Sequence, residues 1–189
     1  MKNLIAVLAL GTVITASSQA QVIDQAQDNA FVYMAAFSQG DLAQSFKQSA
    51  GSITGAALFT QAGIGTGQFD TITIELWDAL PNNSGNLLRS GSVSNITDGM
   101  WAQVSWADYA ITPGTTHYLR FTSALNVLGI SGDVNNPYAD GQVYANPGYG
   151  SFPSFDYTFR TYTAVPEPAT MAVLGLGAAA MIRRRRSAK

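Results

Sequence analysis

The chain has 189 residues and no cysteine, which excludes thiol catalysis, cysteine metal sites and stabilising disulfides. The formal net charge of −2 is unevenly distributed, because residues 21–164 hold four basic residues against eleven acidic ones, a net charge of −7. An acidic surface repels phosphate backbones, so nucleic acid is not expected as a partner.

The first twenty residues have the three parts of a secretory signal peptide. A basic start precedes an apolar run over residues 4–14, and the small residues Ser18 and Ala20 occupy the −3 and −1 positions of a cleavage site. The apolar run is too short to span a bilayer. We therefore predict a signal helix over residues 1–20, export by the Sec pathway, and cleavage by signal peptidase between Ala20 and Gln21.

Residues 21–164 remain as one domain of roughly 144 residues, enough to bury about two-thirds of its unfolded surface. Short segments in it alternate between apolar and polar residues, the period of half-buried strands. In residues 71–77, for example, Ile72, Ile74 and Leu76 share one face. The candidate strands are residues 31–37, 42–48, 53–60, 71–77, 87–94, 100–106, 116–122, 126–131, 142–145 and 155–161.

Turn formers separate these segments, as in residues 81–85 and 146–150, and no convincing helical periodicity occurs between the two ends of the chain. The pattern predicts an all-β fold, an antiparallel β-sandwich of nine or ten strands. A signal helix would flank it on the N-terminal side and a transmembrane helix on the C-terminal side. The order of the strands is not predictable from this pattern.

The same region resembles β-sandwich domains of the carbohydrate-binding-module type, which have a jelly-roll fold. The matching motifs are Gln-Ser-Phe at 44–46, Ile-Thr-Ile-Glu-Leu-Trp-Asp at 72–78, Thr-Pro-Gly-Thr-Thr-His-Tyr at 112–118 and Asp-Tyr-Thr-Phe-Arg-Thr-Tyr at 156–162. These motifs are structural, so the resemblance implies a jelly-roll sandwich and says little about activity.

Few residues suggest catalysis. His117 is the only histidine, and no Gly-x-Ser-x-Gly elbow for serine hydrolysis occurs. A glycosidase needs two facing carboxylates, and spacing alone does not identify such a pair. Acidic residues at strand ends and turns are usually solvated, so no enzyme is predicted. The acidic residues considered are Asp70, Glu75, Asp78, Asp98, Asp108, Asp133, Asp140 and Asp156.

One acidic loop is a candidate metal site. Asp133, Asn135 and Asp140 offer hard oxygen ligands on a tight loop, as calcium prefers. The loop lacks the register and closing glutamate of an EF-hand, and Asx-turns explain the same residues. We predict an ordinary turn and no cofactor, with calcium as the alternative.

Aromatic residues in loops or on the polar faces of strands are candidate sugar platforms. Core packing or loop covering is the ordinary explanation for them, and stacking on a glycan is the alternative. These residues are Trp77, Trp101, Tyr138, Tyr149 and Phe152.

The C-terminal segment, residues 165–189, has three parts in a fixed order. Pro166, Glu167 and Pro168 keep the chain extended, because each proline fixes φ and disfavours helix before it. The uncharged residues 169–182 would span about 21 Å as a helix, less than the roughly 30 Å of a bilayer core. Snorkelling cationic side chains and local thinning would close most of that gap. The flanking cationic residues are Arg183, Arg184, Arg185 and Arg186.

This Pro-Glu-Pro segment, short helix and arginine cluster resemble the PEP-CTERM sorting domain, found in Gram-negative-type bacteria that make exopolysaccharide. The resemblance implies an exosortase, a membrane transpeptidase that recognises Pro-Glu-Pro, removes the helix and the arginines, and passes the protein outward. The arginines would lie on the cytoplasmic side.

Together these features predict an exported, non-catalytic protein of the cell surface or extracellular matrix. Its precursor would be held in the inner membrane, then processed and released into the exopolysaccharide layer. A glycan-binding module, with or without calcium, is the second hypothesis, and a glycosidase-like hydrolase is the third.

Overall fold

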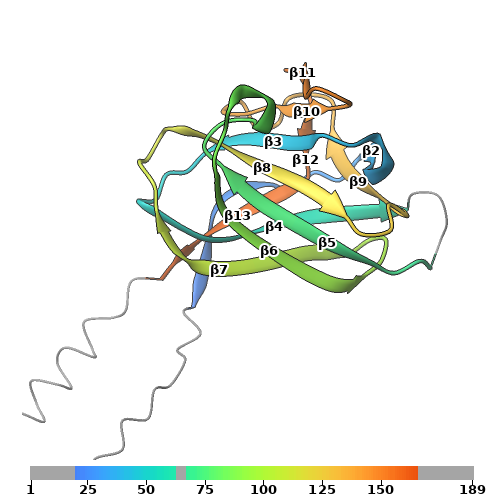
Figure 1. Cartoon of the computed structure of the whole chain (residues 1–189), viewed down its shortest axis with the longest axis horizontal. Coiled ribbons are helices and arrows are strands. Elements are labelled where there is room, and N and C mark those ends of the chain that lie inside the picture. The colour runs from blue at the N-terminus through green and yellow to red at the C-terminus, as the bar shows by residue number, and fades with distance from the viewer. Residues whose placement is uncertain (1–19, 63–66, 166–189) are drawn as a thin grey trace, which may run out of the picture.

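The structure is a computed structural model that describes residues 20–62 and 67–165. Within these ranges the chain forms thirteen strands in two antiparallel sheets and two short 3-10 helices (Figure 1), which confirms the predicted antiparallel β-sandwich. The predicted signal and transmembrane helices lie outside the described residues. No helix in the described ranges is long and apolar enough to cross a membrane.

The first sheet has seven strands. Its spatial order is β1 (Gln21–Gln27), β13 (Phe159–Ala164), β4 (Ser52–Ala62), β9 (Leu128–Asp133) and β12 (Asp156–Tyr157), with β7 (Trp101–Ala110) beside β4 and β2 (Val32–Ala36) beside β9. The long strand β4 joins two halves of this sheet. Its first part pairs with β7 and β13, and residues 60–62 pair with β9.

The second sheet has six strands. Its order is β11 (Gly150–Phe152), β10 (Val143–Ala145), β3 (Leu42–Lys47), β8 (Thr116–Ser123), β5 (Asp70–Trp77) and β6 (Leu87–Ile96). The helices are η1 (Phe37–Gln39), which follows β2 directly, and η2 (Pro81–Asn83), between β5 and β6.

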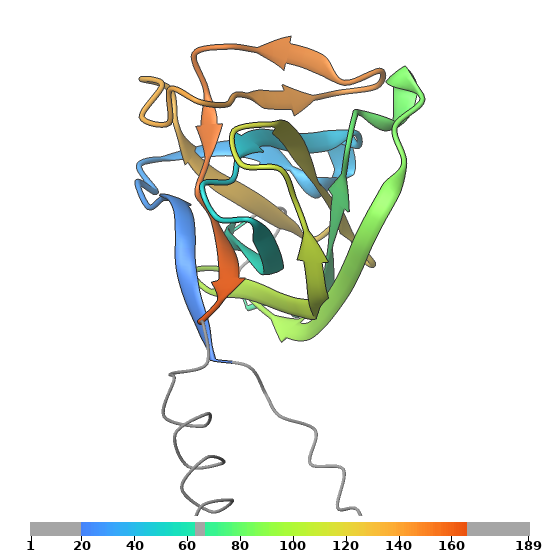
Figure 2. The same cartoon turned by 90° about the vertical axis from the view of Figure 1, so that its left-hand side faces the viewer.

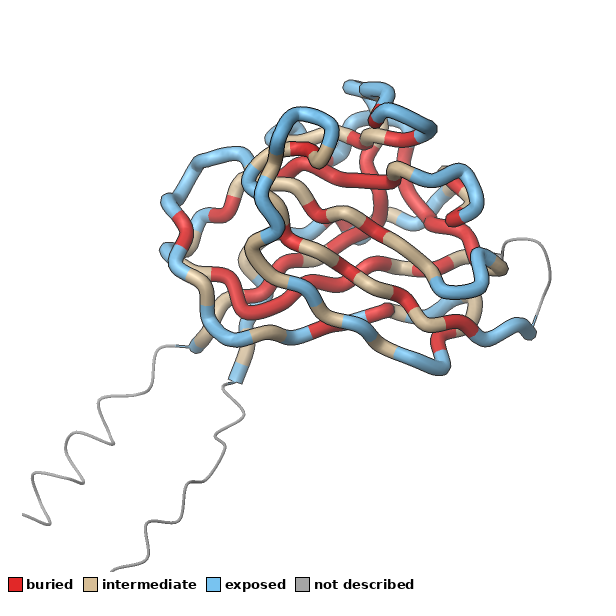
Figure 3. Tube along the Cα trace, viewed as in Figure 1, coloured by how far each residue is buried: buried red, intermediate tan, exposed pale blue. Residues whose placement is uncertain are grey.

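The core lies between the sheets; buried residues alternate with less buried ones along some strands, whereas β3 and β9 are buried along almost their whole length (Figure 3). Strand β5 shows the predicted period of two, because Ile72, Ile74 and Leu76 are fully buried while the residues between them are only partly so. Large aromatic side chains from both sheets, among them Phe46 on β3 and Phe159 on β13, are buried in the same core. Hydrophobic burial on both inner faces therefore holds the two sheets together.

Two strands were not predicted, and one predicted strand is divided. The alternation in β1 is broken by a bulge between Ile23 and Gln25, which shifts its register against β13. Strand β11 has only three residues, too few to show a period. Residues 155–161 fall into β12 and β13, because the chain changes partner from β9 to β4 at Thr158.

The two ends of the described chain lie together. Strands β1 and β13 run side by side toward one end of the sandwich (Figure 2), and the amide of Val165 donates a hydrogen bond of 2.9 Å to the carbonyl of Ala20. Strands β10 and β11 lie at the opposite end in both views. We call these the terminal end and the far end of the sandwich.

Candidate functional site

The predicted signal-peptidase site and the last described residues of the chain lie together at the terminal end. Gln21 pairs with Ala164 across the β1–β13 ladder, so the predicted signal-peptidase site adjoins the start of the C-terminal segment. Pro166, Glu167 and Pro168 and the four terminal arginines lie outside the described residues. In the sequence, one residue, Val165, lies between the end of β13 and Pro166.

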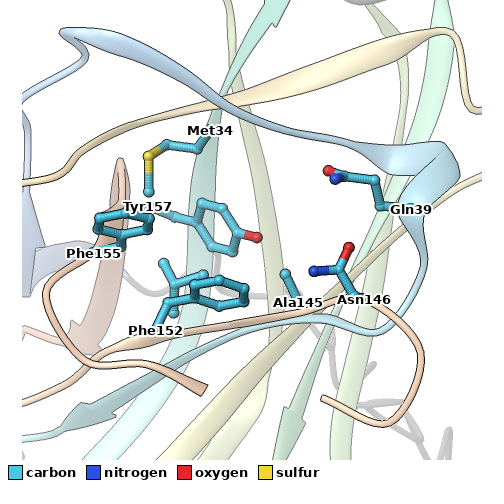
Figure 4. Close-up of a pocket in the computed structure, with 8 residues that line it drawn as sticks. Met34, Gln39, Ala145, Asn146, Phe152, Phe155 and Tyr157 are labelled. Carbon is cyan, nitrogen blue, oxygen red and sulfur yellow. The ribbon is translucent and has the colours of Figure 1, made fainter. Parts of the chain in front are cut away.

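The far end carries a pocket of about 180 Å³ between the edges of the two sheets (Figure 4). Strand β2 and helix η1 form one wall, and β10 to β12 with their connections form the other. All of its lining side chains are uncharged at neutral pH. They are Met34, Gln39, Val143, Ala145, Asn146, Phe152, Phe155 and Tyr157.

A tight turn sets the two phenylalanines of the pocket. The amide of Phe155 donates to the carbonyl of Phe152 at 3.1 Å, and Pro153 occupies the second position of the turn, where its fixed φ is favoured. The turn brings the two rings nearly parallel, 7° apart in plane with centroids 5.8 Å apart. The pocket therefore has a preformed aromatic wall.

Tyr157 lies deeper and is fully buried. Its ring packs edge-on against Phe121 with centroids 5.9 Å apart, and its amide donates to the side-chain oxygen of Gln44 at 2.9 Å. No hydrogen-bond partner for its hydroxyl exists among the described residues. The hydroxyl points toward Gln39 and Asn146 (Figure 4), and burial raises its pKa, so it stays a neutral donor.

The structure keeps two of the predicted calcium ligands, Asp133 and Asn135, together and gives Asp140 a different partner. Asp133 accepts hydrogen bonds from the side chains of Asn135, at 2.8 Å, and Asn29, at 3.1 Å. Burial acts to raise the pKa of Asp133, but these bonds and two from backbone amides bring it below its usual value. Asp140 instead forms an ion pair with Lys47 at 3.3 Å. The described residues contain no group of three His, Cys, Asp or Glu side chains placed to hold a metal.

The aromatic residues predicted as sugar platforms lie in different environments. Of these residues, Phe152 alone lines the pocket. Tyr138 and Tyr149 are buried, which fits core packing. Trp77 lies on the outer face of the second sheet, where its indole N–H donates to Glu75 at 3.0 Å. The ring of Trp101 is covered by the guanidinium of Arg160, 4.1 Å from its centroid.

The buried and half-buried carboxylates considered above have structural partners. Glu75 forms an ion pair with Arg120 at 2.9 Å. Asp70 accepts hydrogen bonds from the hydroxyl of Ser123 and from backbone amides, among them that of Leu125. Asp156 accepts from Gln44 and from a backbone amide. His117 is half-buried beside Phe46, and burial lowers its pKa.

Most pocket residues escaped sequence reasoning. The sequence Phe-Pro-Ser-Phe at residues 152–155 could have predicted part of the pocket, because a tight turn brings its first and last residues together. Met34 and Gln39 gave no signal, since only the folding of β2 and η1 against β10 brings them to the pocket.

A comparison of the sequence with models of known protein families finds one match. The PEP-CTERM protein-sorting motif matches residues 164–186, beginning at the last residue of β13. No match appears among curated proteins. The matched motif indicates an exported surface protein that an exosortase processes, made as a membrane-associated precursor.

Proposed function

We propose that this chain is a non-catalytic component of the cell surface or extracellular matrix of a Gram-negative-type bacterium. Its precursor is held in the inner membrane by the C-terminal segment, then cut by an exosortase near Pro166–Pro168 and released into the exopolysaccharide layer. The observation that carries this proposal is the sorting motif at residues 164–186, which begins where the sandwich ends.

The position of the motif fits such processing. Strand β13 is tied on both sides, to β1 and to β4, so the chain leaves the sandwich at a fixed point. Two prolines at alternate positions keep the following peptide extended, and no helix has to unwind before an enzyme takes it.

The experiment replaces Pro166 and Pro168 by alanine, which removes a penalty of about 3 kcal/mol per proline against helix in this peptide. The double variant should be exported but remain membrane-bound at precursor size, as seen by cell fractionation and immunoblot in a host with the exosortase. Pro113→Ala, in an exposed turn, is the control and should mature normally. Normal maturation of the double variant would sink the sorting proposal.

Two further measurements complete the test. Mass spectrometry of the released protein should find Gln21 as its first residue and no arginine cluster at its C-terminus. Replacing residues 183–186 by glutamine should weaken membrane retention before processing, because the positive charges hold the short helix in place.

A second candidate function is favoured by the pocket at the far end. A preformed cavity with an aromatic wall and a few polar groups is the usual form of a small-ligand site. In a protein released into polysaccharide, the ligand would be a glycan, and the sandwich would then be a glycan-binding module without catalysis.

A further inference from the structure

We propose that the pocket of the far end binds one neutral six-membered sugar ring at the end of a polysaccharide chain. This inference rests on the glycan-binding function proposed above. It specifies the site and the class of sugar, and it assigns Tyr157, Asn146 and Phe152 as the residues that hold the ring.

Size limits the ligand to one ring. The cavity of about 180 Å³ is close to the roughly 150 Å³ of an engineered cavity that admits benzene. It is smaller than the roughly 300–1,000 Å³ of sites that enclose drug-sized ligands. One ring therefore fits inside, and the rest of a chain would lie outside the rim.

The chemistry of the walls selects a ligand with both an apolar face and hydroxyl groups. Phe152 and Phe155 offer aromatic surface, and Met34 adds a polarizable apolar group opposite them (Figure 4). Asn146 and Gln39 add amides at the same cavity. A sugar ring presents C–H groups on its face and hydroxyls around its edge, which matches both kinds of wall.

The hydroxyl of Tyr157 favours a sugar over an acyl chain as the ligand. It is buried and has no hydrogen-bond partner among the described residues, an arrangement that costs free energy in the empty protein. A sugar hydroxyl would supply the missing partner. An acyl chain or an apolar peptide side chain would leave this buried phenol unpaired.

Charge favours a neutral sugar over an acidic one. No cationic side chain lines the cavity, and residues 21–164 carry four basic against eleven acidic residues. A uronic acid would enter this negative field without a counter-charge. No lining group titrates near neutrality, so affinity should be constant between about pH 5 and pH 8.

The test measures binding by calorimetry to the exported protein purified from its host. The probes are glucose, galactose, mannose and N-acetylglucosamine, with glucuronic acid and decanoate as comparisons. At least one neutral sugar should bind, more tightly than either comparison and without dependence on pH. Tyr157→Phe should weaken that binding about fivefold to tenfold, the loss expected for one buried hydrogen bond.

Matched variants separate binding from folding. Tyr138→Phe removes another buried tyrosine hydroxyl, away from the pocket, and should leave affinity unchanged. Asn146 has a φ of +65°, which glycine adopts without strain. Asn146→Gly therefore removes the side-chain amide alone and should weaken binding. Phe152→Ala should weaken it further, and circular dichroism checks that each variant is folded.

Three outcomes overturn the inference: no binding of any neutral sugar, equal affinity in Tyr157→Phe, or preference for decanoate or glucuronic acid. Each would leave the sorting proposal intact, because maturation in the host is measured separately. Conversely, normal maturation of the Pro166 and Pro168 double variant would overturn the sorting proposal without affecting sugar binding by the purified protein.

Discussion

The two ends of the sandwich are held by different interactions. At the terminal end, β1 and β13 form a backbone ladder with one bulge, and each strand is a single run of sequence. At the far end, the pocket combines short elements with a buried side-chain network: Asp156 accepts hydrogen bonds from Gln44 at 2.8 Å and from the amide of Tyr138 at 3.1 Å. Ladders tolerate many side chains, whereas such a network depends on each of its members.

The first test of this difference between the two ends is Asp156→Ala, for which we expect the largest change in stability. The substitution leaves one N–H of the buried Gln44 side chain and the amide of Tyr138 without an acceptor, so the free energy of unfolding should fall by about 3 kcal/mol. Urea denaturation measures the change. Asp108→Ala, at an exposed position of β7, is the control and should be nearly neutral; equal losses in the two variants would contradict the network.

A pair of tyrosines sharpens the contrast at a smaller scale. The hydroxyl of Tyr138 accepts from the amide of Lys47 at 3.1 Å and donates to Gln25 at 3.0 Å. Tyr138→Phe should therefore lower the free energy of unfolding by about 1 kcal/mol. Tyr157→Phe should instead raise it slightly, because it removes a buried hydroxyl that has no partner among the described residues and whose burial costs free energy. A destabilised Tyr157→Phe would mean that this hydroxyl is satisfied in solution.

The pH dependence of stability gives a subtler test. Burial raises the pKa of Asp156, against the opposing hydrogen bonds of Gln44 and Tyr138. The folded protein therefore keeps this proton to a higher pH than the unfolded chain. The stabilising contribution is complete below about pH 3.9 and is lost as pH rises through the folded pKa.

Asp156→Asn removes that titration. The stability of the wild type minus that of the variant should fall as pH rises above about 4, measured by urea denaturation at a series of pH values. Asp70, whose pKa is lowered by its hydrogen bonds despite burial, titrates in both proteins and cancels in the difference. A difference that rises with pH would contradict the direction of the shift.

Chelation should have the smallest effect. Asp133 already accepts N–H groups from Asn29 and Asn135, and Asp140 is paired with Lys47. We therefore expect EDTA to leave the melting temperature unchanged. A drop with EDTA that calcium reverses, and that Asp133→Ala abolishes, would establish the calcium alternative.

Sequence patterns predicted what is local along the chain. The alternation in residues 71–77 identified β5, and the order of prolines, apolar run and arginines identified the sorting motif. Strand β1 escaped because it is an edge strand whose apolar residues Val22 and Ile23 are adjacent in the sequence and both exposed, so it shows no apolar–polar alternation. The pocket escaped because its members come from β2, η1 and β10 to β12, and contacts between distant segments leave no period in the sequence.

The placement of β13 has a mechanical consequence. This strand runs from Phe159, next to the pocket segment β12, to Ala164 at the terminal end, with β1 and β4 on either side. If a ligand were held at the far end and the tail at the other, tension would act along the axis of β13. The ladder bonds lie perpendicular to the strand, so they would share the load in shear instead of opening one after another. In the precursor we propose, a pull between a bound ligand and the membrane-held tail would thus meet the β13 ladder in shear.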